Sequence, residues 1–297
     1  MASTRPAILV QLDTDPQPSV FDAVVAVDSG VDHLLRHGGV TAGNGRDLVY
    51  GCLFTRGPAD LHRSALFIGG SDVAAGEAVL EAVKAAFFGP FRVSVLFDAN
   101  GANTTAAAAV LAALEGAGGS LEGIPAAVLA ATGPVGQRVA RLLARLGAKV
   151  AVGSRRLDRA SQTAESLRST TGGTFTSFAT SDPADLTRGL AGAAVVIAAG
   201  ASGVVLLPES VRKGSTDLKV VIDLNAVPPL GVEGVKSGDA GADRDGVKAW
   251  GALGVGGAKM KIHKEAVRRL FTANDQVLDA EEVLEIGRSL KSSASPG

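Results

Sequence analysis

Apolar residues along the chain form short continuous runs that alternate with longer stretches of helical periodicity. Short runs bounded by glycine, proline or aspartate are typical of buried strands, and a repeat near 3.6 residues is typical of helices. The runs predict strands over 6–12, 64–70, 91–98, 125–131, 148–153, 173–179, 193–200 and 218–226. The periodic stretches predict helices over 19–30, 72–89, 102–115, 134–146, 157–170, 183–191 and 279–291. This alternation implies parallel sheets covered on both faces, so we expect an α/β fold.

A change in composition divides the chain near its middle. The sequence "GAGGSLEG" over 116–123 follows a long predicted helix and is typical of a hinge. We therefore expect two domains, an N-terminal α/β domain over 1–118 and a second domain with a parallel sheet over 119–274. The C-terminal segment 275–291 is expected to pack back on the first domain. The sequence "SGDAGADRDG" over 237–246 has the composition of a loop.

Composition and charge narrow the classes of function. The chain has 29 basic and 30 acidic residues, so its charge does not favour a nucleic acid or an anionic membrane as partner. Its single cysteine, Cys52, can form no internal disulfide, which suits a reducing cytoplasm. No apolar run approaches the roughly 18 residues of a membrane span. The pair His33 and His37 alone does not make a metal site. We expect a cytoplasmic globular protein without a metal.

A nucleotide-binding motif follows the predicted strand 125–131. The Gly-x-Gly-x-x-Gly fingerprint is present except that Ala131 replaces its first glycine. Gly133 would let the backbone approach a pyrophosphate, and Gly136 would let the helix pack closely on the strand. The alternative is an ordinary strand-to-helix turn. The residues expected to hold the pyrophosphate at the helix N-terminus are Thr132, Gly133, Pro134, Val135 and Gly136.

The sequence Ser154-Arg155-Arg156 follows the next predicted strand, about 20 residues beyond the fingerprint. In a dinucleotide-binding fold this position meets the adenosine 2′ group, where an acidic residue would bind a free hydroxyl. A serine and two arginines instead suit a 2′-phosphate, so the sequence favours NADP over NAD. Alternatively, both arginines are merely solvated at the start of a helix.

Small and polar residues at other strand ends are further candidates, because ligands of open α/β sheets bind outside the carboxyl ends of the strands. In the second domain these residues are Ala199, Gly200 and Asn225. In the first domain, the sequences "LDTDPQPS" and "DANGANTT" could hydrogen-bond a polar heterocycle. The candidates there are Asp15, Ser19, Asp98, Asn100, Asn103 and Thr104. Turns and helix caps are the alternative explanation for both groups.

Side chains suited to acid–base catalysis are scarce in the first hundred residues, which contain one lysine, Lys84, and one tyrosine, Tyr50. The chain also lacks a nucleophile elbow, a metalloprotease motif and a Walker motif. Hydride transfer between a nicotinamide and a carbon activated by adjacent nitrogen needs two positioned rings and no enzyme acid or base. The scarcity therefore favours this class of reaction.

Six segments together resemble one known family. They are "QLDTDPQPSVFDAVVAVDSGVDH", "FIGGSDVAAGEAV", "AAFFGPFRVSVLFDANGANTTAAAA", "ATGPVG", "DLNAVPPLG" and "ALGVGGAKMKIHK". They are similar to the NADP-dependent methylene-tetrahydromethanopterin dehydrogenases of bacterial one-carbon metabolism. The resemblance implies reversible hydride transfer from methylene-tetrahydromethanopterin to NADP, which gives the methenyl cation.

The resemblance also implies roles for the two domains and for a lysine-rich segment. The N-terminal domain would bind the tetrahydropterin, and the second domain would be a Rossmann-like NADP domain. Lys259 and Lys261 match a stretch of the family near the substrate. Asp98, Asn100 and Lys259 are positioning candidates, and no residue is assigned as a catalytic acid or base. We expect a homo-oligomer.

Alternatives to this substrate stay open. The family is similar in architecture to folate-type dehydrogenase/cyclohydrolases, which carry a Tyr-x-x-x-Lys motif, whereas Tyr50 is followed four residues later by Phe54. A methylene-tetrahydrofolate dehydrogenase without cyclohydrolase activity is therefore one alternative. A dehydrogenase for another substrate, such as a shikimate-like acid, and a non-catalytic NADP-binding protein are the others.

Overall fold

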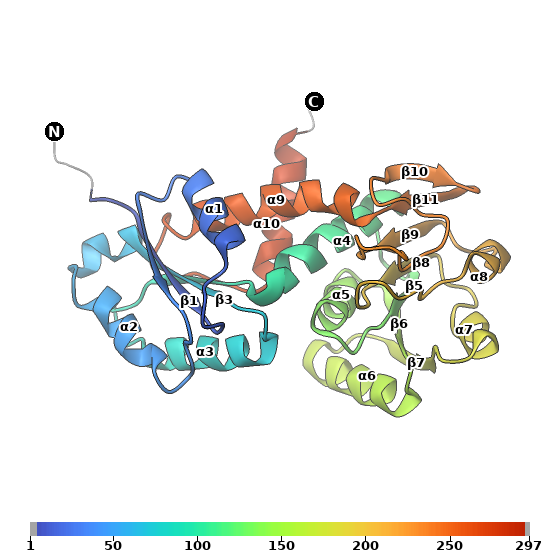
Figure 1. Cartoon of the computed structure of the whole chain (residues 1–297), viewed down its shortest axis with the longest axis horizontal. Coiled ribbons are helices and arrows are strands. Elements are labelled where there is room, and N and C mark those ends of the chain that lie inside the picture. The colour runs from blue at the N-terminus through green and yellow to red at the C-terminus, as the bar shows by residue number, and fades with distance from the viewer. Residues whose placement is uncertain (1–4, 295–297) are drawn as a thin grey trace. The chain divides into compact units, whose positions relative to one another are not determined.

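The computed structural model describes residues 5–294 and shows an α/β protein, which confirms the predicted fold class (Figure 1). The described residues form two compact units. The first comprises the residues up to Thr104 together with those from Met260 onward, and the second comprises Thr105–Lys259. Within 5–294, no helix is long and apolar enough to cross a membrane.

Two long helices each contribute to both units. They are α4 (Ala102–Gly116) and α9 (Ala252–Arg269). The bounds of the units therefore differ from the predicted 1–118 and 119–274. The reason is that each boundary falls inside a continuous helix, where the sequence shows no loop or change of composition.

The first unit contains a parallel sheet with the strand order β12-β4-β3-β1-β2. Its strands are β1 (Ile8–Asp13), β2 (His33–His37), β3 (Ser64–Gly69), β4 (Ser94–Phe97) and β12 (Val277–Leu278). The three central strands consist almost wholly of buried residues, as expected of strands covered on both faces. These are the three strands predicted in this region. The edge strand β2 was not predicted, because its sequence HLLRH is mostly exposed.

Two helices of the first unit, over Val20–Asp28 and Val73–Ala86, begin at side chains that cap them. Ser19 Oγ accepts a hydrogen bond from Asp22 N at 3.2 Å, and Asp72 Oδ1 accepts one from Ala75 N at 3.0 Å. Such caps satisfy N–H groups that have no partner within the helix. The helices and 3₁₀ turns are α1 (Val20–Asp28), α2 (Gly45–Leu53), η1 (Pro58–Arg63), α3 (Val73–Ala86), η2 (Ala99–Gly101) and α10 (Ala280–Ala294).

The second unit contains a sheet with the order β10-β11-β9-β8-β5-β6-β7, in which all neighbours except β10 and β11 are parallel. The first strand in sequence, β5, lies between β6 and β8, so the direction of strand addition reverses there, as in a Rossmann fold. The strands are β5 (Pro125–Leu129), β6 (Lys149–Ser154), β7 (Phe175–Ala179), β8 (Val195–Ala198), β9 (Val220–Asp223), β10 (Ala240–Arg244) and β11 (Val247–Trp250). The helices are α5 (Pro134–Arg145), α6 (Leu157–Thr171), α7 (Pro183–Gly189) and α8 (Glu209–Gly214).

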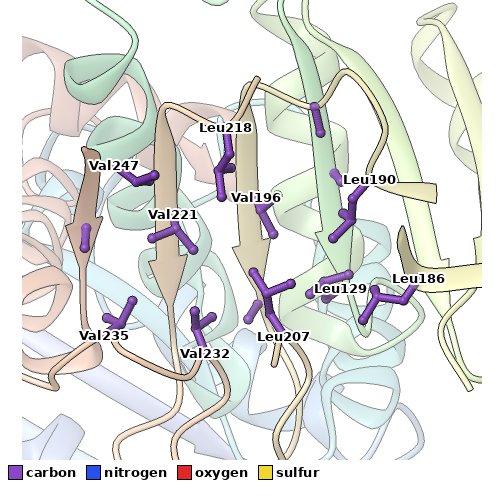
Figure 2. Packing of buried hydrophobic residues seen from close by; sticks show 14 of the residues in the cluster. Leu129, Leu186, Leu190, Val196, Leu207, Leu218, Val221, Val232, Val235 and Val247 are labelled. Carbon is purple, nitrogen blue, oxygen red and sulfur yellow. The ribbon is translucent and has the colours of Figure 1, made fainter. Parts of the chain in front are cut away.

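A cluster of buried aliphatic side chains lies on one face of this sheet (Figure 2). Its strand residues alternate in sequence, as Ala127 and Leu129 do on β5, because alternate side chains of a strand share a face. Burial of each valine or leucine contributes about 1.5–3 kcal/mol. The labelled members are Leu129, Leu186, Leu190, Val196, Leu207, Leu218, Val221, Val232, Val235 and Val247.

The predicted loop over 237–246 is wrong, because the structure places β10 there. β10 pairs with β11 through a hairpin whose turn residues, Asp245 and Gly246, have φ angles of 57° and 82°. Asp-Gly with two positive φ angles is a strong hairpin signal. The polar composition of the segment reflects the edge position of β10, where side chains meet solvent.

Candidate functional site

The turn between β5 and α5 has the features of a phosphate-binding turn. Gly133 is the N-cap of α5, and no side chain caps the first turn of this helix. Uncapped N–H groups and the positive end of the helix dipole suit an anion. The turn is fixed to the neighbouring strand, because Ala131 N donates a hydrogen bond to Gly153 O on β6 at 2.9 Å.

The two glycines of the motif meet different demands. A Cβ at Gly136 would lie 2.7 Å from both Ala130 O and Ala131 Cα, so only glycine lets α5 pack this closely on β5. A Cβ at Gly133 would meet nothing nearer than 3.6 Å, and the φ of Gly133 is an ordinary −79°. No contact within the chain therefore requires glycine at position 133. The absence of a side chain there instead leaves space for a ligand to approach the backbone. The residues present therefore fit the pyrophosphate of a dinucleotide.

Ala131 stands where the fingerprint has its first glycine, and the residue before it, Ala130, adopts the positive φ that the turn requires. The positive φ of the turn, 55°, lies at Ala130, whereas Ala131 is buried and has no positive φ. Alanine in the left-handed region costs about 1–2 kcal/mol because its Cβ approaches the following carbonyl oxygen. The turn thus retains its shape without the first glycine, at the expense of local strain.

Relief of this strain is expected to stabilise the protein. Ala130→Gly should raise the free energy of unfolding by about 0.5–1 kcal/mol, because glycine adopts positive φ without the Cβ contact. Ala131→Gly is the matched control and should lower it by a similar amount, about 0.5–1 kcal/mol, since Ala131 has no positive φ. Denaturant titration measures both values. A change of the same sign in the two variants would contradict the strain at Ala130.

The tip beyond β6 carries two exposed arginines. Ser154 is buried at the end of the strand, and its Oγ lies 3.5 Å from Arg156 N. Arg156 donates to both carboxylate oxygens of Asp158, at 3.0 and 2.5 Å, and these hydrogen bonds lower the pKa of Asp158 below its usual value. Arg155 is exposed. An ion pair this exposed is weak, so a phosphate can compete with Asp158 for Arg156.

The end of β8 adjoins the phosphate turn. Leu129 of β5 pairs with Ala198 of β8, and Ala199 N donates to Leu129 O at 3.1 Å. A Cβ at Gly200 would lie 2.5 Å from Leu206 Cδ1 and 3.4 Å from Ala130 Cβ, so glycine lets this segment pack against the turn. The structure therefore brings Ala199 and Gly200 beside the pyrophosphate motif, at the point where strand order reverses.

Asn225, in contrast, is bonded to its own loop. Its Nδ2 donates to Pro229 O at 3.0 Å and its Oδ1 accepts from Val227 N at 2.9 Å. The buried carboxylate of Asp223 accepts from Asn225 N and Val232 N, and burial raises the pKa of Asp223. These hydrogen bonds within the loop support the alternative explanation for Asn225, in which its side chain stabilises a turn. A contact of Asn225 with the cofactor stays a prediction.

At the carboxyl edge of the first unit, Asp98 faces inward. Its Oδ1 accepts from Asn103 N at 2.9 Å and Thr104 N at 3.0 Å, and its Oδ2 accepts from Thr104 Oγ1 at 2.6 Å. Asn103 Nδ2 donates to Phe97 O at 2.6 Å and to Asp279 Oδ1 at 2.8 Å. Asp98, Asn103 and Thr104 are all buried. In this structure they fix the start of α4 and present no open surface to a ligand.

Asn100 is the exposed member of the same segment. It has a positive φ of 53°, and its N–H donates to Gly70 O at 2.6 Å, which ties the end of β4 to the end of β3. Asparagine tolerates this conformation better than most residues. The side chain of Asn100 therefore remains a candidate for substrate contact.

The loop after β1 holds the other predicted substrate residues. Asp15 accepts from Ser71 N at 3.0 Å and Ser71 Oγ at 2.8 Å, which joins the loops after β1 and β3. Ser19 caps α1. The buried Asp13 organises the loop, because its carboxylate accepts from Asp15 N and Ser19 N, both at 3.0 Å. Asp15 and Ser19 are thus brought to the same edge as Asn100.

A buried histidine at this edge was missed. His263 of α9 stacks on Phe67 of β3, with ring centroids 5.7 Å apart, and lies 6.4 Å from the ring of Phe21. Its Nδ1 lies 4.0 Å from Asp98 Oδ2. Asp22 of α1 lies in the same cluster, and burial raises its pKa. A histidine inside the otherwise amphipathic helix that contains "KMKIHK" was the signal available in the sequence.

Lys259 and Lys261 do not act from one face of their helix. Both belong to α9, where two residues of separation correspond to a rotation of roughly 200°. Lys259 is half-buried and Lys261 is exposed. The pair therefore cannot contact one ligand from the same side, and of the two we retain Lys259 as the positioning candidate.

Among residues 5–294 there is no group of three or more histidine, cysteine, aspartate or glutamate side chains that could hold a metal ion. The ring of Phe67 stacks on the buried imidazole, whereas the tilted ring of Phe21 is 51% exposed.

Comparison with known proteins identifies the family. A sequence model of the N-terminal part of methylene-tetrahydromethanopterin dehydrogenase matches residues 20–100. The "Bifunctional protein MdtA" of Methylorubrum extorquens is 45% identical to the chain over 283 residues, which are 95% of this chain and 98% of that protein. The chain belongs to the methylene-tetrahydromethanopterin dehydrogenase family. The resemblance seen in the sequence is confirmed.

Another member of the methylene-tetrahydromethanopterin dehydrogenase family extends this comparison. A protein of Methylorubrum extorquens named NAD(P)-dependent methylenetetrahydromethanopterin dehydrogenase is 29% identical over 91% of this chain and 93% of its own length. Both family members thus match more than nine-tenths of the chain.

Solved structures similar to the chain share its fold. Shikimate 5-dehydrogenase from Listeria monocytogenes, in complex with shikimate and NAD, has a TM-score of 0.54 and 17% identity, covering 96% of this chain and 97% of that one. The 5-ketofructose reductase of Gluconobacter has a TM-score of 0.51 and 17% identity, covering 96% and 99%. At such identities the likeness shows the α/β fold of the family and not the substrate.

Proposed function

We propose that the protein is an NADP-dependent methylene-tetrahydromethanopterin dehydrogenase of one-carbon metabolism. It is an oxidoreductase that reversibly removes a hydride from the methylene carbon and leaves the methenyl cation. The observation that carries this proposal is the 45% identity to a family member across 95% of the chain. The nucleotide turn at Gly133 and Gly136 supports it independently, because it fits a dinucleotide.

The second unit binds the cofactor in this proposal. The backbone N–H groups at the start of α5 hold the pyrophosphate, and Arg155 and Arg156 bind the 2′-phosphate. Ala199 and Gly200 pass beside the turn and limit the space around it. When bound, NADP supplies the hydride acceptor. The protein's task is to hold it in place, which is the main requirement of a hydride transfer.

The first unit binds the tetrahydropterin through its carboxyl edge. Asp15 and Ser19 from the loop after β1 and Asn100 from the end of β4 gather there, and all have polar side chains suited to a polar heterocycle. Lys259 on α9 stays a positioning candidate from the sequence alone. No residue need exchange a proton with the substrate, because the reaction moves a hydride only.

An assay of NADPH formation tests the proposal. We expect turnover when methylene-tetrahydromethanopterin and NADP are supplied together, and slower turnover when NAD replaces NADP. The rate should depend on protein concentration and vanish without the pterin. NADP binding without turnover of either methylene-tetrahydromethanopterin or methylene-tetrahydrofolate would contradict the proposal and favour a non-catalytic nucleotide-binding protein.

Methylene-tetrahydrofolate is a second candidate substrate. The relative with 45% identity is named as a bifunctional protein. Methylene-tetrahydrofolate shares the reacting ring system of the first pterin, so the same site suits its chemistry. The ratio of kcat/KM for the two pterins, measured at saturating NADP, distinguishes a specific enzyme from one that accepts both.

The proposal includes a homo-oligomer in the cytoplasm. Four large apolar side chains of the nine-residue helix α1 are exposed, and a group of this kind on a folded protein is typical of an interaction surface. They are Val20, Phe21, Val24 and Val27. Light scattering coupled to gel filtration measures the mass, and a monomer at micromolar concentration would contradict the oligomer.

A further inference from the structure

The buried carboxylate of Asp223 closes the loop that follows β9. Asp223 is 1% exposed, and its Oδ1 accepts from Asn225 N and its Oδ2 from Val232 N, both at 3.0 Å. A Cβ at Gly231 would lie 2.6 Å from Asp223 Oδ1, so the returning chain passes directly against the carboxylate. The two oxygens thus fix both ends of the loop over 224–231.

This loop is joined to the segment that follows β8. Gly231 O accepts from Leu206 N at 2.8 Å and from Leu207 N at 3.0 Å, and Leu207 O accepts from Glu233 N at 3.0 Å. Leu207 and Val232 form a parallel bridge, and both side chains belong to the buried aliphatic cluster (Figure 2). The segments after β8 and β9 therefore share one set of backbone hydrogen bonds, and a shift of one displaces the other.

Leu206 extends these contacts to the phosphate turn. A Cβ at Gly200 would lie 2.5 Å from Leu206 Cδ1 and 3.4 Å from Ala130 Cβ, so Gly200 lies closely between the two side chains. Ala130 has the positive φ of the turn, and its carbonyl oxygen accepts from Gly133 N at 3.2 Å. All of these residues belong to the second unit. A continuous series of contacts therefore joins Asp223 to the turn expected to hold the pyrophosphate.

We infer that Asp223 is a positioning residue for the pyrophosphate of NADP. It fixes the loop after β9 and, through Gly231 and Leu206, holds Gly200 against the phosphate turn. The inference rests on the NADP binding of the proposed function. Because Asp223 is buried, it acts through these neighbours and not by contact with the cofactor. A turn held in place has its backbone N–H groups already oriented, which lowers the cost of ordering them when the pyrophosphate binds.

A carboxylate suits this position better than a neutral amide would. Both oxygens of Asp223 face backbone donors, and an ionised carboxylate presents acceptors only. Burial raises the pKa of Asp223, and hydrogen bonds from the backbone of Asn225, Val232 and Gly231 oppose this effect. Asparagine at this position would turn its NH2 group toward one of the backbone N–H groups. One fixed end of the loop would then lose its acceptor.

Binding of two nucleotides to the parent and four variants tests the inference. The variants are Asp223→Asn, Leu206→Ala, the double variant and the control Asp243→Asn. Asp243 also accepts from the backbone of a turn, Gly246 N at 3.0 Å, but that turn precedes β11 and so lies at the opposite edge of the sheet. The Kd of NADP is measured by calorimetry. The Kd of adenosine 2′-monophosphate, which has the 2′-phosphate and no pyrophosphate, is measured by NMR titration.

Asp223→Asn and Leu206→Ala are each expected to raise the Kd of NADP about tenfold, because the phosphate turn loses its support. The Kd of adenosine 2′-monophosphate should not change, since this ligand needs Arg155 and Arg156 and not the turn. The double variant should bind NADP little more weakly than the weaker single variant, because both residues act through the same contacts. Asp243→Asn should match the parent for both ligands.

The outcomes separate the inference from the proposed function. Unchanged NADP binding in Leu206→Ala, equal weakening of both nucleotides, or losses that multiply in the double variant would overturn the inference. Equal weakening is the result of a general loosening of the unit. If Asp223→Asn does not fold, Leu206→Ala decides alone, because it leaves the carboxylate in place. A parent that binds NADP but turns over neither pterin would contradict the proposed dehydrogenase and leave the inference standing, whereas a parent that binds no NADP would overturn both.

Discussion

Replacement of both Arg155 and Arg156 with alanine should raise the KM for NADP at least about tenfold and leave the KM for NAD nearly unchanged. Both side chains lie exposed beyond β6, where a dinucleotide-binding fold presents the adenosine 2′ group. Charge-assisted hydrogen bonds to a phosphate are stronger than neutral ones, and NAD has no phosphate at this position. The double variant therefore removes a contact that only one cofactor makes.

The single variants refine this expectation. Arg156 pairs with Asp158, so Arg156→Ala leaves a carboxylate without its partner beside the phosphate position. We expect Arg156→Ala to weaken NADP more than Arg155→Ala does. Lys149→Ala is the matched control, since Lys149 is exposed at the opposite end of the same strand. An equal loss for NADP and NAD in the double variant would refute the 2′-phosphate assignment.

Arg212→Ala should lower the free energy of unfolding by about 3–5 kcal/mol. The side chain of Arg212 is 1% exposed, and its guanidinium donates to Glu233 O at 3.0 Å, Arg244 O at 3.1 Å and Asp245 Oδ2 at 2.6 Å. It thereby joins α8 to the β10–β11 hairpin. Truncation removes one donor from each of two carbonyl groups and leaves a cavity in place of the side chain.

An exposed arginine of the same unit is the comparison for Arg212. The side chain of Arg188 on α7 is 73% exposed and pairs with Asp185, so Arg188→Ala should change stability by less than about 0.5 kcal/mol. Denaturant unfolding in the absence of cofactor measures both variants. A small effect at Arg212 would mean that the hairpin does not depend on this buried guanidinium.

The central strands and the nucleotide turn could be predicted because their signals are local. Strands such as β3 and β8 are continuous runs of buried apolar residues, and Gly136 is required by contacts within its own turn. The edge strands β2 and β10 have no such run, since their residues meet solvent. Exposed strands are defined by their neighbours in the sheet, which a sequence pattern does not specify.

The polar residues of the substrate edge were harder to interpret because burial depends on tertiary packing. Asp98 and Asn100 are two residues apart and look alike in sequence, yet Asp98 is buried and caps α4 whereas Asn100 is exposed. His263 was missed because its partners, Phe67 and Asp98, lie far away along the chain. Only the topology of the first unit brings these three residues together.

The division of the first unit between both ends of the chain has a consequence for biosynthesis. Thr105–Lys259 form one contiguous unit, so all residues of the nucleotide-binding unit are synthesised before Met260. The first unit, whose strands β1 to β4 are synthesised earliest, must wait for His263, β12 and α10 before it is complete. The sheet of the first unit is therefore completed only after the second unit has been synthesised. Until then β4 presents an unpaired edge, which a nascent-chain chaperone would be expected to cover.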